Sequence, residues 1–139
     1  MSEHDRRTAK LWHDLTRLVL DNKDTWRRAV VAETGLPFSR IRILTRLAGR
    51  PMTVKEVAAT ATIDAPAATV AVNDLESRGL VLRETDPADR RSKLVSLTHA
   101  GQAVVARVRA VEDPAPAAIA GLDDHDLTAL QALVDKIVG

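Results

Sequence analysis

Three basic side chains, Arg90, Arg91 and Lys93, follow the turn sequence Asp86-Pro87-Ala88-Asp89. Aspartate and proline favour tight turns, so this sequence predicts a loop that projects the basic side chains in a reproducible direction. Arginine is attracted to narrow minor grooves of DNA, where the negative potential is enhanced. We therefore expect a DNA-binding loop in which Asp86 fixes the turn and Asp89 restrains the neighbouring Arg90. The alternative is an ordinary charged hairpin on the surface.

A second candidate surface lies on the helical segment predicted from Asp64 to Arg78. Its spacing directs Ala68, Val72 and Leu75 to a core, and the outward face then carries Pro66, Ala67, Thr69, Val70, Asn73 and Asp74. Asparagine can pair with adenine through two hydrogen bonds, and alanine or valine can contact a thymine methyl group. The face has no arginine to read guanine, and Asp74 is expected to repel phosphate. We therefore expect the basic loop and DNA shape to carry much of the recognition, unless Thr69 and Asn73 are simply solvated.

A third group of basic residues lies near the segment 38–48 and includes Arg40, Arg42, Arg46 and Arg50, with no acidic residue among them. These arginines predict phosphate contacts or an anion-binding patch, the alternative being a solvated helix face. Ser39 and Thr53 both lie near expected helix starts. Each can donate to a phosphate beside backbone N–H groups, or act only as a helix cap.

The apolar spacing places these residues on a mostly helical chain with one small β-hairpin. Helices are predicted at about 6–33, 38–48, 54–60, 64–78, 99–111 and 123–138, and strands at 80–84 and 93–97. Thr53 and Glu56 are spaced as a capping box, Thr98 is a cap, and Gly79 ends a helix. This order is typical of a winged helix-turn-helix, in which the second helix of the pair enters the major groove and the hairpin reaches the backbone.

Charge and composition narrow the function further. The net charge of +1 is the sum of +1 over residues 1–33, +5 over residues 34–111 and −5 over residues 112–139, and this distribution favours a polyanionic partner for the middle of the chain. The absence of cysteine excludes disulfides, a thiol nucleophile and a thiol redox sensor. Only three aromatic residues occur, too few for a platform that stacks single-stranded bases. No motif of an enzyme, cofactor site or metal site is found, and the four histidines are scattered, so we expect none of the three.

The segment from Leu75 to Gly101 resembles the MarR (multiple antibiotic resistance regulator) family of dimeric winged-helix transcription factors. The similar positions are Leu75-Glu76, Gly79-Leu80, Asp86-Pro87, Asp89-Arg90-Arg91, Leu97-Thr98 and Gly101. The order of helices and the chain length are also similar to the family's. The outward face of the helix 64–78 has few polar residues and no arginine, and in this it departs from the family's usual pattern of serine, threonine and arginine.

The resemblance implies one MarR-like domain over residues 1–139. Residues 1–35 and 112–139 would form dimerisation helices, 36–98 the winged-helix lobe that binds DNA, and 99–111 a connecting helix. It implies a cytoplasmic homodimer that represses transcription from a pseudo-palindromic operator and is released by a ligand. The alternative is a winged-helix module for protein interaction that does not bind DNA.

Two further groups of residues follow from that interpretation. The expected dimer interface comprises the apolar stripes of the first and last helices: Leu11, Leu15, Leu18, Leu127, Leu130, Leu133 and Ile137. The expected ligand pocket contains Trp12, Phe38 and Arg42, because two aromatic rings and a cation suit a small aromatic or anionic effector. Core packing of the two aromatic rings is the alternative.

Overall fold

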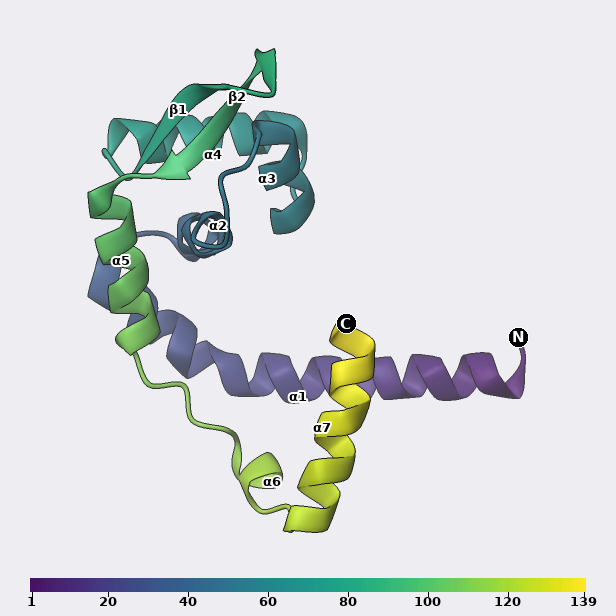
Figure 1. Cartoon of the computed structure of the whole chain (residues 1–139). Coiled ribbons are helices and arrows are strands. Elements are labelled where there is room, and N and C mark those ends of the chain that lie inside the picture. Colours follow the sequence, from purple (N-terminus) through teal and green to yellow (C-terminus); the bar gives the residue numbers. More distant parts are fainter. The chain divides into compact units, whose positions relative to one another are not determined.

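The computed structural model describes all 139 residues, which form seven helices and one hairpin (Figure 1). The elements are α1 (Glu3–Thr34), α2 (Phe38–Leu47), α3 (Val54–Ala61), α4 (Ala65–Ser77), β1 (Val81–Asp86), β2 (Asp89–Leu97), α5 (His99–Ala110), α6 (Ala117–Ala120) and α7 (Asp124–Val138). The chain divides into two units, one formed by residues 23–112 and the other by residues 1–22 and 113–139. The mostly helical class with a winged helix-turn-helix is thus confirmed.

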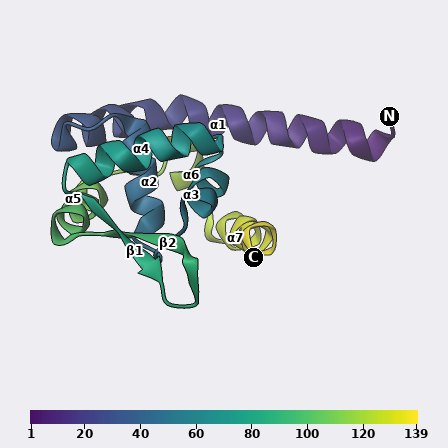
Figure 2. The same cartoon turned by 90° about the horizontal axis from the view of Figure 1, so that it is seen from above.

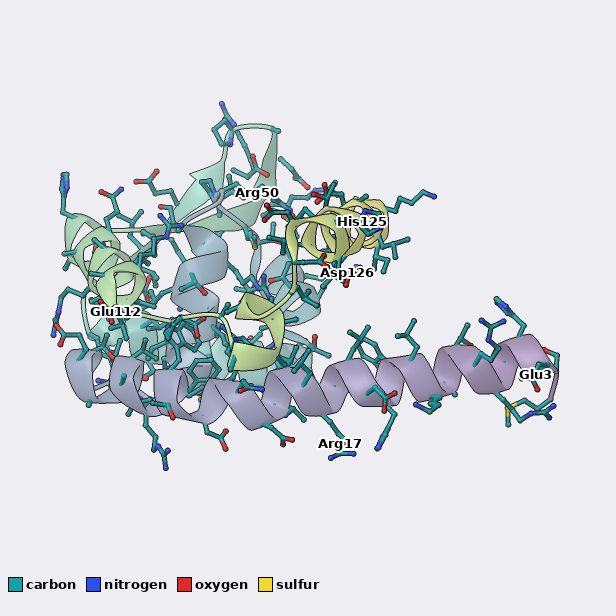
Figure 3. The ribbon with its side chains drawn as sticks, turned by 90° about the horizontal axis from the view of Figure 1, so that it is seen from below. Glu3, Arg17, Arg50, Glu112, His125 and Asp126 are labelled. Atoms are coloured by element: carbon teal, nitrogen blue, oxygen red, sulfur yellow. The ribbon has the colours of Figure 1, made fainter.

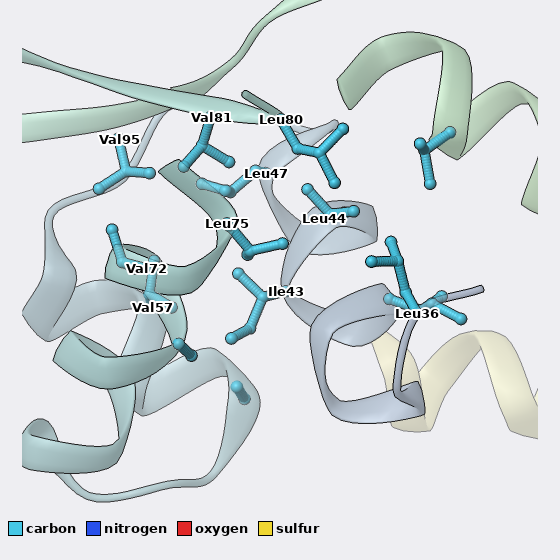
Figure 4. Close-up of a cluster of buried hydrophobic side chains, with 14 of the residues drawn as sticks. Leu36, Ile43, Leu44, Leu47, Val57, Val72, Leu75, Leu80, Val81 and Val95 are labelled. Atoms are coloured by element: carbon cyan, nitrogen blue, oxygen red, sulfur yellow. The ribbon is translucent and has the colours of Figure 1, made fainter. Parts of the chain in front are cut away.

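The core lies in the unit of residues 23–112, where α2, α3, α4 and α5 pack with the hairpin (Figure 4). Its largest fully buried side chains are Ile41, Ile43, Leu44, Leu75, Val30, Val57, Val72 and Val95. Each such side chain contributes about 1.5–3 kcal/mol by leaving water. No polar or charged residue is buried. Packing of apolar side chains therefore fixes α4 and the hairpin on the same scaffold.

Side-chain caps decide where three of these helices begin, and those at Thr53 and Thr98 are predicted from the sequence. Thr53 and Glu56 form the complete capping box of α3. The Asp64 carboxylate accepts from the backbone N–H of Ala67 at 2.8 Å and begins α4. The Thr98 hydroxyl accepts from the N–H of Gly101 at 3.1 Å and begins α5. Each cap satisfies a backbone donor that has no partner inside its helix.

The hairpin is longer than the sequence analysis predicted. Its strands pair antiparallel from Val81 opposite Leu97 to Asp86 opposite Asp89, leaving only Pro87 and Ala88 in the turn. The expected turn residues Asp86 and Asp89 are therefore the last paired residues, and the register is irregular between Thr85 and Asp86. In Figure 2 this end of the hairpin projects away from the helices of its own unit.

The remaining differences from the sequence analysis are small. α1 begins at Glu3 instead of about residue 6, and the four-residue helix α6 was not predicted. Ile43 is fully buried together with Ile41 and Leu44, because α2 is covered from several sides by α3, α5 and the hairpin.

The unit of residues 1–22 and 113–139 exposes many apolar side chains. α7 has no buried residue, and Leu127, Leu133 and Ile137 are 45%, 57% and 73% exposed. On α1, Leu11 is 56% exposed, while Leu15, Leu18 and, on α7, Leu130 are half-buried. Figure 3 shows the polar faces of the same helices, with Glu3 and Arg17 on α1 and His125 and Asp126 on α7. The unit therefore leaves much of its apolar surface uncovered in a single chain.

Candidate nucleic-acid interface

α4 presents its outer face to solvent because its inner face is anchored in the core. Ala68, Val72 and Leu75 are fully buried, as the sequence predicts, and Ala71 joins them. The exposed residues on the outer side include Pro66, Ala67, Thr69, Val70 and Asn73. Val70 is 61% exposed. α4 can therefore offer both apolar and hydrogen-bonding groups to a partner.

An arginine that the sequence analysis missed lies beside this outer face. The guanidinium of Arg83, on β1, donates through Nη2 to the Asn73 side-chain oxygen. It also reaches the Glu76 carboxylate, with Nη2 at 3.2 Å from Oε1 and Nε at 3.4 Å from Oε2. Arg83 lies two residues after the buried Val81, so both side chains leave the strand on the same side. That alternation was the signal in the sequence that could have placed Arg83 against α4.

Asp74 corrects another expectation for this face. Its carboxylate is half-buried between two arginines, with Oδ2 2.9 Å from Nε of Arg40 and Oδ1 3.2 Å from Nε of Arg78. The hydrogen bond from Arg40 is the main reason why the pKa of Asp74 is lowered, and the bond from Arg78 adds to it. Asp74 therefore ties α4 to α2 and is neutralised, so the expected repulsion of phosphate does not follow from this geometry.

The basic loop keeps its cations exposed at the end of the hairpin. Arg90, Arg91 and Lys93 all lie at the surface, and the side chain of Arg91 is 93% exposed. The Asp86 carboxylate accepts from the N–H of Ala88 at 2.9 Å, which restrains the turn. Asp89, however, accepts from Nε of Arg91 at 3.4 Å and from the Arg91 backbone. The expected partner Arg90 is left without an ion pair, because the paired strands point it away from Asp89.

The other expected phosphate ligands divide into two groups. Ser39 is exposed in the first turn of α2, whereas Thr53 is half-buried and engaged in the capping box. Arg40 is occupied by Asp74, and Arg50 by Glu56 at 2.7 Å. The bond from Arg50 is also the main cause of the lowered pKa of Glu56. The four arginines therefore do not form one continuous patch.

Arg42 and Arg46 instead line a cavity of about 450 Å³ in the same unit. Its other lining residues are Lys23, Trp26, Arg27, Phe38, Ile41 and Thr45. The rings of Trp26 and Phe38 meet edge to face with centroids 5.7 Å apart. The Arg27 guanidinium lies 4.9 Å from the centre of the Phe38 ring, and its buried Nε has no hydrogen-bond partner.

This cavity contains two of the three residues expected in the ligand pocket. Phe38 and Arg42 line it, but the aromatic partner is Trp26 instead of Trp12, whose side chain is 71% exposed. No group of three or more metal-ligating side chains is present, and no helix has the length and hydropathy to cross a membrane.

Comparison with known proteins identifies relatives of the winged-helix unit. The sequence model described as "MarR family" matches residues 34–92. No curated protein matches the chain. The solved structure of apo MarR from E. coli is 22% identical with a TM-score of 0.72, over 91% of this chain and 96% of that one.

Two structures of the protein CouR are also similar to this chain. The transcriptional repressor CouR bound to a 23-mer DNA duplex is 25% identical with a TM-score of 0.69, over 100% of this chain and 99% of that one. CouR from Rhodococcus jostii RHA1, bound to p-coumaroyl-CoA, is 28% identical with a TM-score of 0.61, over 81% of each chain. The segment 34–92, which contains the hairpin motif at Asp86–Arg91, therefore matches the MarR family, and the chain as a whole shares the winged-helix fold of these solved structures.

Proposed function

We propose that this protein is a cytoplasmic homodimer that binds a pseudo-palindromic DNA operator and represses transcription until a small effector releases it. The observation that carries the proposal is the exposed outer face of α4 next to a projecting hairpin with exposed cations. α4 has the dimensions to enter a major groove, and the hairpin then lies over the adjacent minor groove. The similarity to CouR, a repressor solved with a DNA duplex, supports this assignment.

Arg90 is the hairpin residue best suited to the minor groove. It is exposed and has no ion pair to break, whereas Arg91 is held near Asp89. The variant Arg90→Ala is expected to bind a specific duplex more weakly than the wild type by roughly 1–3 kcal/mol. Gel-shift titration at fixed salt measures this change. Unchanged affinity would remove the hairpin from the interface.

Dimerisation is supported by the uncovered apolar residues of α1 and α7. Leu127, Leu130, Leu133 and Ile137 recur at three- and four-residue spacing along α7, and all of them except the half-buried Leu130 are exposed in the single chain. A second copy of the chain would cover them. We expect Leu133→Asp to convert the dimer to monomer in sedimentation equilibrium. Thr128→Asp, on the exposed polar side of α7, is the matched control and should leave the dimer intact.

The cavity beside α2 is the effector site in this proposal. Its edge-to-face ring pair offers contacts for an aromatic ring, and Arg27, Arg42 and Arg46 offer positive charge for an anion. We therefore propose a small aromatic acid or its thioester as the effector, a class to which the p-coumaroyl-CoA bound by CouR belongs.

Calorimetry with p-coumarate and p-coumaroyl-CoA tests the effector class. Binding is expected to weaken in Arg42→Ala, and p-coumaryl alcohol, which keeps the ring without the anion, should not bind measurably. Equal binding of the alcohol would contradict the role of the arginines.

Selection of bound duplexes from a random library tests the function itself. A palindromic consensus is expected, because a symmetric dimer presents two copies of α4 to two half-sites. A protein that enriches no duplex would instead favour the interaction module, for which the apolar residues Pro66, Ala67 and Val70 on α4 would be the docking surface.

A further inference from the structure

Arg83, on β1 of the hairpin, connects the hairpin to the outer face of α4 through several hydrogen bonds of its guanidinium. Nε and Nη2 of its guanidinium lie 3.4 Å and 3.2 Å from the two carboxylate oxygens of Glu76. The same Nη2 donates to the side-chain oxygen of Asn73. A planar guanidinium held by two such contacts has little rotational freedom. Glu76 therefore holds Arg83, and Arg83 in turn holds the Asn73 amide.

This contact decides which end of the Asn73 amide is available to a ligand. An asparagine side chain carries an accepting oxygen and a donating NH₂ group, and a free amide can exchange the two by rotation. Here the oxygen is directed to the guanidinium, which only donates. Rotation would bring the NH₂ group against the guanidinium donors. The NH₂ group is thus left as the end of Asn73 that faces solvent.

We propose that Arg83 is a positioning residue for base reading and that Asn73 selects a base with a keto oxygen in the major groove. Guanine and thymine present the keto oxygens O6 and O4 as acceptors there. Cytosine presents only an amino donor, and adenine presents an amino donor beside its N7 acceptor. The inference rests on the proposed function, since it assumes that α4 lies in a major groove. It also reverses the simpler expectation from the sequence, in which Asn73 pairs with adenine.

The surroundings of Arg83 argue against a simple role as a phosphate ligand. Its side chain is 25% exposed, far less than the 93% of Arg91 on the hairpin. Its charge is also compensated by the Glu76 carboxylate. A cation that is half-covered and paired contributes less to long-range attraction of DNA than an exposed one. Its three directed hydrogen bonds are better explained by a geometric role.

The experiment begins with selection of bound duplexes by the full-length protein. Affinity is then measured for four versions of the enriched site, which differ in the base at one position, the position that depends on Asn73. That position is the one whose preference disappears in Asn73→Ala. The wild type is expected to favour a keto base over an amino base about five- to tenfold, the value of one directed hydrogen bond. Arg83→Lys keeps the charge but loses the fork, so this preference should fall below about twofold while the salt dependence stays unchanged.

Two further variants separate positioning from charge and from folding. Arg78→Met removes a cation that contacts α4 but not Asn73, so it should leave the base preference intact. Arg83→Lys in the Asn73→Ala background should have no further effect at this position. Circular dichroism confirms that each variant is folded before binding is measured.

Three results would overturn the proposal. The first is a wild-type preference for adenine or cytosine at the Asn73 position. The second is an unchanged preference in Arg83→Lys. The third is the absence of any enriched duplex for the wild type, and only this third result would also refute DNA binding.

Discussion

Gly101 is the position where a single methyl group should damage the winged-helix unit most. It lies in the first turn of α5, where a side-chain Cβ would overlap the carbonyl oxygen of Leu80. The Leu80 carbonyl carbon and Cδ2 of Leu97 would be 3.1 Å and 3.3 Å away. The Leu80 oxygen cannot easily move, because it accepts a hydrogen bond from the N–H of Thr98 at 3.1 Å. We therefore expect Gly101→Ala to separate α5 from the start of the hairpin.

The expected magnitude follows from two opposing effects. Overpacking against fixed backbone costs about 1–3 kcal/mol or more. Alanine gains at most about 1 kcal/mol over glycine in a helix, and less in the first turn. Because the overlap at Gly101 is with fixed backbone, the upper half of the overpacking range applies, about 2–3 kcal/mol, and the net loss of unfolding free energy is then about 1–3 kcal/mol. For a unit of this size that corresponds to a melting temperature lower by roughly 4–24 °C.

Urea unfolding followed by circular dichroism at one protein concentration measures this loss, with two other glycines as matched controls. At Gly49 a Cβ would meet only the Arg46 carbonyl oxygen at 3.4 Å, so Gly49→Ala should change stability by less than about 0.5 kcal/mol. At Gly79 space is open but φ is +73°, so Gly79→Ala should cost about 1 kcal/mol through backbone strain alone. A Gly101→Ala protein as stable as Gly49→Ala would refute the close approach of α5 and Leu80.

Three other changes probe caps and charges. Thr53→Ala removes the capping box of α3 and should lower the unfolding free energy by about 0.5–2 kcal/mol in urea titration. Because Arg40 lowers the pKa of Asp74, Asp74 stabilises the fold above its unfolded pKa of about 3.9, and this stabilisation is lost as the pH falls through its lower folded pKa. Asp74→Asn should therefore lose less stability between pH 7 and pH 2 than the wild type, as measured by thermal melts. Arg107→Met removes a half-exposed pair with Glu33 and should cost no more than about 1 kcal/mol at low salt.

Local features of this fold could be predicted because their causes are local in sequence. The capping box at Thr53, the cap at Thr98 and the left-handed Gly79 each depend on residues within three or four positions. The buried face of α4 follows from helical spacing alone. These features are sufficient to predict the helices of the winged-helix unit.

Contacts between elements could not be predicted in the same way. The pairing of Asp74 with Arg40 joins residues 34 positions apart, and it depends on how α2 and α4 rotate against each other. The sequence analysis places Trp12 in one pocket with Phe38, yet the ring that meets Phe38 is Trp26, which lies fourteen residues closer to the turn at Gly35. The contact of Arg83 with Asn73 likewise needs a fixed strand beside a fixed helix. Such side chains determine specificity, and their positions follow from packing and not from spacing.

The most direct test of the central claim is the salt dependence of binding to an enriched duplex. Two copies of the hairpin, each with Arg90, Arg91 and Lys93 exposed, should neutralise several phosphates. The logarithm of the association constant is then expected to fall linearly with the logarithm of salt concentration, with a slope of about −3 or steeper. An association constant that does not change with salt would contradict the account of α4 and the hairpin as a DNA-reading surface. Equal affinity of the wild type for the enriched duplex and for unrelated duplexes would contradict it as well.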